Sequence, residues 1–119
     1  MGIFSASVIL KNPAQPERQR EVSLLVDTGS LFTWVSAPVL EGIGIQPVET
    51  EQLRTTTGAL VERRIGYSIV AHDGRSGAMN VVFAEPGDTE VLGVTALETL
   101  RVAPDPVQQK LIPVVALAV

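Results

Sequence analysis

Residues 24–30 decide the fold of this chain, and they read Leu24-Leu25-Val26-Asp27-Thr28-Gly29-Ser30. An apolar strand runs directly into an acid, a hydroxyl residue and a glycine. Glycine lets the backbone turn tightly and lets a ligand come close, while threonine carries its hydroxyl on a stiff side chain. The pattern therefore predicts a covered strand that delivers Asp27 to a functional loop. The alternative is an ordinary strand-to-turn boundary, because Asp, Gly and Ser are common turn residues.

The length and composition of the chain exclude several classes of function. The chain has the length of one domain, residues 1–119, and can bury a core without disulfides. It contains no cysteine and a single histidine, His72, which excludes thiolate chemistry and a histidine-rich metal cluster. We therefore expect no metal and no cofactor. We assign no role to His72, which is expected at the surface.

Charge and targeting signals exclude further classes of protein. The formal net charge is −4 and no basic run is present, which argues against a nucleic-acid partner. The first residues lack the basic start and long apolar stretch of a signal peptide. The most apolar segment, residues 111–119, is too short to span a bilayer. We expect a cytoplasmic protein without a membrane partner.

Frequent valine, clustered threonine and scattered glycine and proline favour an all-β fold. Alternation of apolar and polar residues predicts several strands, of which two pairs form hairpins. The expected strands and hairpins are residues 3–10, 21–26, 31–35, a hairpin over 51–64 with its tip at 55–58, a second hairpin over 65–83 that turns at Asp73-Gly74, and 110–119. Short helices are expected after Ser36 and over 94–100, where Thr95 and Glu98 have capping-box spacing.

A second motif, Val91-Leu92-Gly93, leads into the later of these helices. Together with Asp27-Thr28-Gly29-Ser30 and the intervening hairpins, this order resembles one lobe of an aspartic peptidase of the retropepsin type (clan AA). The resemblance covers nearly the whole chain and is strongest to small prokaryotic single-domain members, whose late segment is similar to residues 92–100. It implies a retropepsin-like acid-protease fold, a closed, barrel-like β domain with one or two short helices and one lobe per chain.

The resemblance implies roles for the residues of the active-site loop. Asp27 matches the catalytic aspartate, and Thr28 matches the threonine whose hydroxyl ties two active-site loops together across a dimer axis. Gly29 matches the glycine beside the bound peptide. Ser30 stands where many cellular members have serine, with its hydroxyl expected near the carboxylate.

Other matching positions lie outside the loop. Thr56, Thr57 and Gly58 match the tip of the substrate-binding flap, which with one glycine should be stiffer than the glycine-rich viral flaps. Gly93 matches the glycine that packs behind the active-site loop. Trp34 departs from the family pattern because it is large for its strand, and it should crowd or shape a substrate pocket.

A dimer follows from the count of motifs. Aspartic catalysis needs two carboxylates, one to take a proton from water and one to donate a proton to the scissile carbonyl. The chain has one Asp-Thr-Gly; Asp88-Thr89-Glu90 lacks the glycine and is expected to face solvent, as are Arg63 and Arg64. The second carboxylate would come from Asp27 of another copy, in an isologous homodimer. Residues 111–119 are either a dimer strand or an internal core strand.

Three functions are compatible with the sequence. The leading one is a homodimeric aspartic endopeptidase that hydrolyses an extended peptide or protein substrate with a water activated by paired Asp27 carboxylates. The second is a catalytically weak or inactive peptide-binding or dimerisation module of the same fold. The third is a β domain of unrelated function, in which Asp27 lies in a structural turn.

Overall fold

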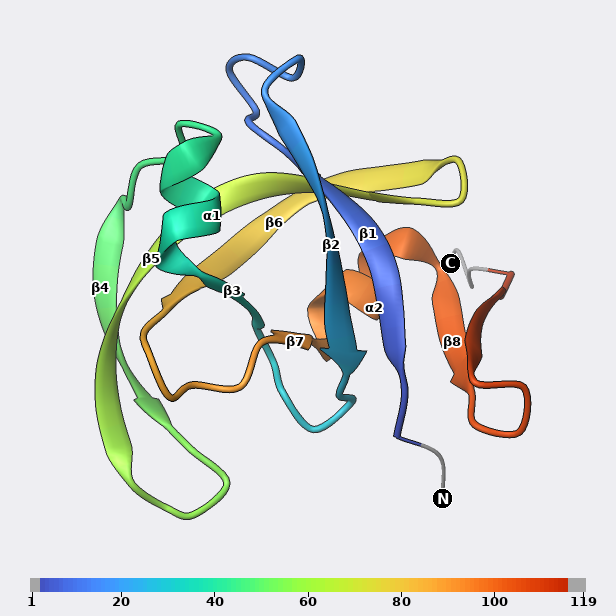
Figure 1. The fold of residues 1–119 in the computed structure, drawn as a ribbon. Coiled ribbons are helices and arrows are strands. Elements are labelled where there is room, and N and C mark those ends of the chain that lie inside the picture. Colours follow the sequence, from blue (N-terminus) through green and yellow to red (C-terminus); the bar gives the residue numbers. More distant parts are fainter. Residues whose placement is uncertain (1–2, 116–119) are drawn as a thin grey trace.

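The computed structural model describes residues 3–115, and these form a mostly β structure (Figure 1). The all-β prediction is therefore confirmed. Within the described residues, no helix is long and apolar enough to cross a membrane. The elements in chain order are β1 (Ser5–Lys11), β2 (Gln19–Val26), β3 (Thr33–Ser36), α1 (Ala37–Gly42), β4 (Glu49–Arg54), β5 (Leu60–His72), β6 (Arg75–Ala84), β7 (Val91–Leu92), α2 (Val94–Leu100), β8 (Val102–Asp105) and β9 (Lys110–Pro113).

The main sheet closes on itself through its hydrogen bonding. Seven strands follow the order β1-β2-β7-β3-β6-β5-β4, and β1 also pairs with β5 (Figure 1). The pairs β2–β7 and β3–β6 are parallel, whereas the remaining pairs of this sheet are antiparallel. Strands β8 and β9 form a separate two-stranded sheet. This order places the end of β2 and the start of β3 beside β7, although β7 lies far from both of them in the sequence.

The β1 strand shows the predicted alternation. Phe4, Ala6, Val8 and Leu10 are buried, while Ser5 and Ser7 on the other face are exposed. Burial of every second residue is what a strand with one face on the core requires. The helix α2 covers the same core, to which it contributes three buried side chains: Ala96, Leu97 and Leu100.

Over residues 66–70 the β5 strand turns the less apolar of its two faces to the core. Gly66, Ser68 and Val70 are buried there, whereas Tyr67 on the opposite face is 49% exposed. Ser68 tolerates full burial because its hydroxyl donates hydrogen bonds to carbonyl oxygens, including that of Lys11 at 3.3 Å. The apolar count of the two faces therefore does not decide which one meets the core.

The capping box predicted for the second helix is wrong. Gly93 occupies the N-cap position of α2, so Thr95 already lies inside the helix and cannot cap it with Glu98. The Thr95 hydroxyl instead donates to the carbonyl oxygen of Leu31 at 2.6 Å. Ser36 does occupy the N-cap position of α1, as predicted, but makes no side-chain capping hydrogen bond. Thr95 thus ties α2 to the loop after β2.

The C-terminal part forms a small hairpin of its own. The strand β8 extends to Asp105, and in the turn that follows the Asp105 carboxylate accepts hydrogen bonds from the backbone N–H groups of Val107 and Gln108. The strand β9 pairs antiparallel with β8. The final strand predicted over 110–119 is too long, because β9 ends at Pro113 and residues 114–115 are not in a strand; residues 116–119 lie outside the described residues.

Candidate active site

The loop after β2 holds Asp27 by backbone contacts on both sides. The N–H of Asp27 donates to the carbonyl oxygen of Leu92 at 3.0 Å, which continues the parallel pairing of β2 with β7. The Asp27 carboxylate accepts a hydrogen bond from the N–H of Gly29 at 2.9 Å, and the Asp27 carbonyl accepts one from Ser30 N–H at 3.3 Å. Within residues 3–115, no Lys, Arg or His forms an ion pair with Asp27. The loop therefore presents a half-buried carboxylate without a cationic partner.

Gly93 lies directly behind this loop. A Cβ atom at residue 93 would lie 2.3 Å from the Phe32 carbonyl oxygen and 2.8 Å from that of Ser30. The Gly93 N–H donates to the hydroxyl of the fully buried Thr33 at 3.1 Å, and the Val94 N–H donates to the Ser30 carbonyl at 2.7 Å. Only glycine fits this contact. Thr33 was not predicted from the sequence, because threonine is common in strands and its position alone gives no signal.

The Ser30 hydroxyl takes a different partner from the one expected. It donates to the carbonyl oxygen of Phe32 at 2.8 Å, across the loop. This bond supports the loop itself, since it joins two residues of the same turn.

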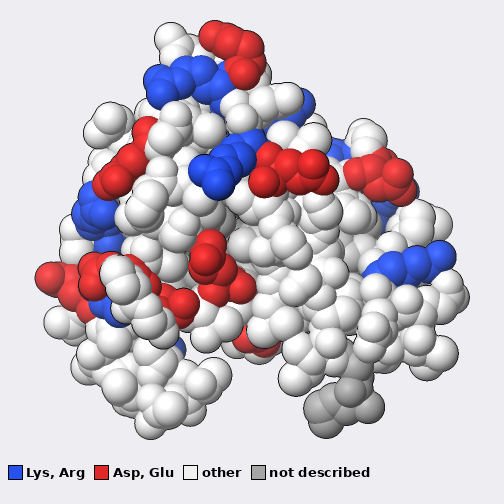
Figure 2. Space-filling model, viewed as in Figure 1, with Lys and Arg blue, Asp and Glu red and all other residues white. Residues whose placement is uncertain are grey.

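A cleft of about 660 Å³ opens in front of Asp27. Three segments line it: the loop and strand over 27–34, the β4–β5 hairpin over 52–57, and residues 87–91. The space-filling view shows the molecule hollowed between the hairpin at the lower left and the rest of the chain (Figure 2). The predicted site residues that line the cleft are Asp27, Gly29, Ser30, Thr56 and Thr57. Thr28 and Gly58 are exposed, and Gly93 is buried behind the loop.

The tip of the β4–β5 hairpin is closed by its own hydrogen bonds. The Gly58 N–H donates to the Thr55 carbonyl, and the Thr55 N–H donates to the Ala59 carbonyl, both at 2.9 Å. The hydroxyls of Thr55 and Thr57 lie 2.9 Å apart, and Arg54 donates to the Gly58 carbonyl at 2.9 Å. Gly58 has a φ of 87°, which favours glycine. The hairpin predicted at these residues is therefore confirmed, with a compact tip.

The wall of the cleft is backed by a row of apolar residues, of which Trp34 alone was singled out from the sequence. Ile65, Val82, Trp34 and Val91 are direct neighbours across four strands and therefore share one face of the sheet. Ile65, Val82 and Val91 are buried although they lie outside the main core cluster. Trp34 and Val91 line the cleft. An apolar wall therefore stands next to the Asp27 carboxylate.

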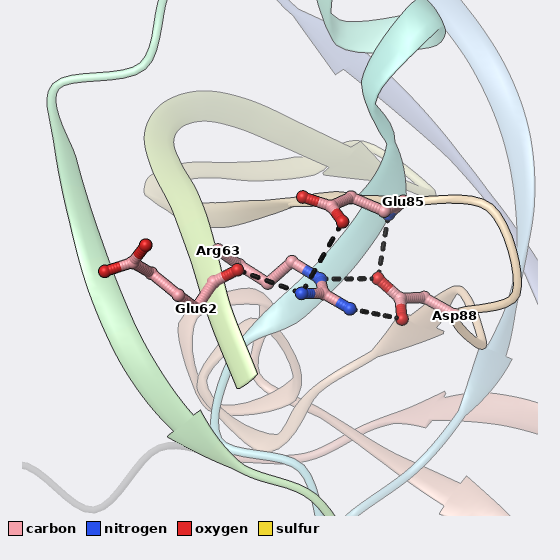
Figure 3. A network of polar contacts seen from close by, with 4 residues as sticks. All are labelled: Glu62, Arg63, Glu85 and Asp88. Atoms are coloured by element: carbon pink, nitrogen blue, oxygen red, sulfur yellow. Dashed lines mark hydrogen bonds and ion pairs between the residues drawn. The ribbon is translucent and has the colours of Figure 1, made fainter. Parts of the chain in front are cut away.

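The prediction that Arg63 and Asp88 face solvent is wrong. Their side chains are 14% and 17% exposed and form a bidentate ion pair, with Arg63 Nε and Nη2 at 2.8 and 2.9 Å from the two Asp88 oxygens (Figure 3). The Glu85 carboxylate lies 3.6 Å from Arg63 Nη1. The hydrogen bond to Arg63 holds the pKa of Asp88 below its ordinary value of 3.8, and the same bond raises the pKa of Arg63. Asp88 is thus a neutralised acid in the wall of the cleft.

The remaining charged candidates are less enclosed. Arg64 lies over the Phe83 ring, 4.8 Å from its centroid, and pairs with Glu41 at 3.4 Å with both side chains substantially exposed. His72 is half-buried, with Nδ1 3.0 Å from the Ser7 carbonyl oxygen. Within the described part of the chain, no group of three or more potential ligands could hold a metal ion.

Comparison of the chain with protein-family models, curated proteins and solved structures gave no match. The chemistry of the site is therefore argued from its geometry. One carboxylate without a cationic partner lies in a cleft that has an apolar wall and a hydroxyl-bearing hairpin opposite. Such a carboxylate can accept a proton from a water molecule and so activate it for attack.

Proposed function

We propose that this chain is a homodimeric aspartic endopeptidase with a retropepsin-like lobe in each subunit. The observation that carries the proposal is the position of Asp27, whose carboxylate lines a cleft together with the tip of the β4–β5 hairpin. The self-closing sheet and the packing of Gly93 behind the loop support it. The chain supplies one such carboxylate, so the second comes from Asp27 of another copy.

The proposed reaction is hydrolysis of a peptide bond. One of the paired carboxylates takes a proton from a water molecule while the other, protonated, donates its proton to the scissile carbonyl oxygen. The water oxygen bonds to the carbonyl carbon, the C–N bond then breaks, and the leaving nitrogen takes up a proton. Two carboxylates this close hold one proton between them, so activity depends on the titration of the pair.

The cleft suits an extended peptide. Its apolar wall, with Trp34 and Val91, offers a surface for uncharged side chains. The hairpin that covers the opposite side presents backbone groups and the Thr56 and Thr57 hydroxyls. Main-chain hydrogen bonds to a hairpin and pockets for alternate side chains are how extended peptides are generally bound.

A second candidate is a peptide-binding or dimerisation module of the same fold with little turnover. The closed hairpin tip favours it, because a tip that satisfies its own hydrogen bonds has fewer groups left to act on a substrate. The same cleft would then bind a peptide without cleaving it.

The decisive experiment compares two matched variants in cleavage of a diverse peptide pool from acidic to neutral pH. Asp27→Asn removes the proposed catalytic carboxylate, and we expect the cleavage rate to fall at least about 10³-fold. Asp105→Asn is the control, because Asp105 accepts backbone N–H bonds in a similar turn away from the cleft, and we expect full activity.

Two results would reject the endopeptidase proposal. One is an Asp27→Asn protein that keeps wild-type cleavage. The other is a folded wild-type dimer that binds peptides at every pH tested without cleaving them, which would establish the binding module. Sedimentation equilibrium of each protein supplies the oligomeric state.

A further inference from the structure

The root of the β4–β5 hairpin is the point where this element leaves the main sheet. Residues 65–72 of β5 pair with β6, whereas residues 60–64 pair with β4 alone. In β4 only Leu53 is even partly buried. The part of the hairpin that lines the cleft therefore has few packing contacts of its own, and its position depends on what holds its root.

Arg63 lies at this root and is bound from several sides. Its Nε and Nη2 bind the Asp88 carboxylate, and its Nη1 donates to the Glu62 carbonyl at 2.9 Å and lies 3.6 Å from Glu85 (Figure 3). A planar guanidinium with its nitrogens engaged on two segments holds a fixed orientation, unlike a single exposed ion pair.

The turn that carries Asp88 is itself well defined. The Asp88 N–H donates to the Glu85 carbonyl at 2.9 Å, and the Asp88 carboxylate accepts a hydrogen bond from the Glu85 N–H at 2.8 Å. Pro86 and Gly87, with a φ of 92° at the glycine, occupy the central positions, as in a type II turn. Asp88 therefore presents its carboxylate to Arg63 from a rigid base.

This turn also forms one wall of the cleft, since Gly87, Asp88 and Thr89 line it. A second side-chain contact, from Glu90 to the Ser36 N–H at 3.0 Å, ties the same segment to β3 and α1. Through Arg63, the pair with Asp88 ties the same segment to the hairpin. It thereby connects two of the three walls between which a peptide would lie.

We propose that Arg63 and Asp88 are positioning residues, which fix the root of the β4–β5 hairpin against the 85–90 turn and so set the width of the cleft for a bound peptide. The effect on turnover rests on the proposed peptidase function. The effect on the hairpin does not, and this separates the two in the test.

Hydrogen exchange of the free protein tests the structural part. In Asp88→Asn we expect the amides of residues 53–61 to exchange about tenfold faster than in the wild type. Glu41→Gln is the matched control, because it removes the same charge from the partner of the adjacent Arg64, in a pair with both side chains substantially exposed. We expect no change in this segment for the control.

Peptide cleavage tests the functional part. We expect Asp88→Asn to raise KM about tenfold while kcat stays within about twofold, because a loosened hairpin weakens binding and leaves Asp27 untouched. A general loss of stability would instead lower the active fraction and hence the apparent kcat. Asp88→Glu, which keeps the carboxylate, should recover most of the wild-type KM.

Arg63→Gln provides a second variant if Asp88→Asn does not fold, and the same changes are expected. The proposal would be overturned if the amides of residues 53–61 exchange no faster in Asp88→Asn and Arg63→Gln than in Glu41→Gln. If the wild type binds peptides without cleaving them, the Kd of a bound peptide replaces KM. The peptidase proposal then fails, while exchange still decides the positioning role.

Discussion

The Asp27 loop and the Glu85–Asp88 turn face the same cleft, and each carries a carboxylate into its lining. In the turn, Asp88 is held by a guanidinium and by a backbone N–H, and its negative charge is matched. In the loop, Asp27 accepts a hydrogen bond from the Gly29 N–H and forms no ion pair within residues 3–115.

The difference shows how one cleft uses acids in two ways. A carboxylate with a matched charge and fixed hydrogen bonds supports the backbone, because removing its partner leaves a desolvated charge. The Asp27 carboxylate, which accepts one backbone hydrogen bond, has further acceptor positions for a ligand or a water. In the proposed function Asp27 carries the chemistry of the cleft, while Asp88 is tied into the cleft wall by Arg63.

The largest expected effect comes from filling the space behind the Asp27 loop. Gly93→Ala should lower the free energy of unfolding by about 4 kcal/mol or prevent folding, because the new methyl group would collide with backbone carbonyls that cannot move aside. Urea denaturation measures this. Gly42→Ala is the control, since a Cβ at residue 42 meets nothing within 4 Å, and wild-type stability for Gly93→Ala would contradict the packing described.

Truncation of the two acids should separate their roles. Asp88→Ala should cost about 2 kcal/mol because it leaves Arg63 without its partner, whereas Asp27→Ala should cost about 0.5 kcal/mol for one hydrogen bond. Chemical denaturation at neutral pH and fixed protein concentration compares them. Equal losses would remove the distinction between the two regions.

Removal of the Thr33 hydroxyl tests the support of the loop. Thr33→Val should cost about 1.5 kcal/mol, because the buried N–H of Gly93 loses its acceptor while the side-chain shape is kept. The Gly93 amide should exchange faster in Thr33→Val than in Thr33→Ser, which keeps the hydroxyl. Identical Gly93 exchange in these variants would show that the bond contributes nothing.

The last expected effect is a dependence of stability on pH. Because the pKa of Asp88 is lowered in the folded state, its pairing stabilises the protein fully above the ordinary value of 3.8, and this stabilisation is lost as the pH falls through the lower folded value. The wild type should exceed Asp88→Asn by about 1 kcal/mol near neutral pH and converge with it in acid. If the stability difference between the wild type and Asp88→Asn persists in strong acid, it does not come from the ionised Asp88 carboxylate.

Local patterns were sufficient for much of the fold. The alternation in β1, the hairpin tip at residues 55–58 and the turn at Asp73-Gly74 all depend on neighbouring residues, and the structure has them where the sequence indicates. The strand that delivers Asp27 also lies where the sequence indicates, but it is not covered as predicted, since Leu24 is its one buried residue and Leu25 and Val26 are half-buried.

Contacts between distant residues could not be predicted in this way. Arg63 and Asp88 are 25 residues apart, and nothing next to either one indicates the other. The partner of the Thr33 hydroxyl is the N–H of Gly93, 60 residues further along the chain. Each depends on which strands become neighbours, which is a property of the whole sheet.

The backbone bond from Asp27 N–H to the Leu92 carbonyl has a consequence for synthesis on the ribosome. A nascent chain that reaches residue 92 contains the whole Asp-Thr-Gly-Ser segment and the residues of β7, but it lacks the glycine against which the loop packs. Pairings between such distant residues form late in folding, because the intervening chain must be ordered first. Until residue 93 has been synthesised, the nascent protein therefore carries Asp27 without the glycine against which its loop packs.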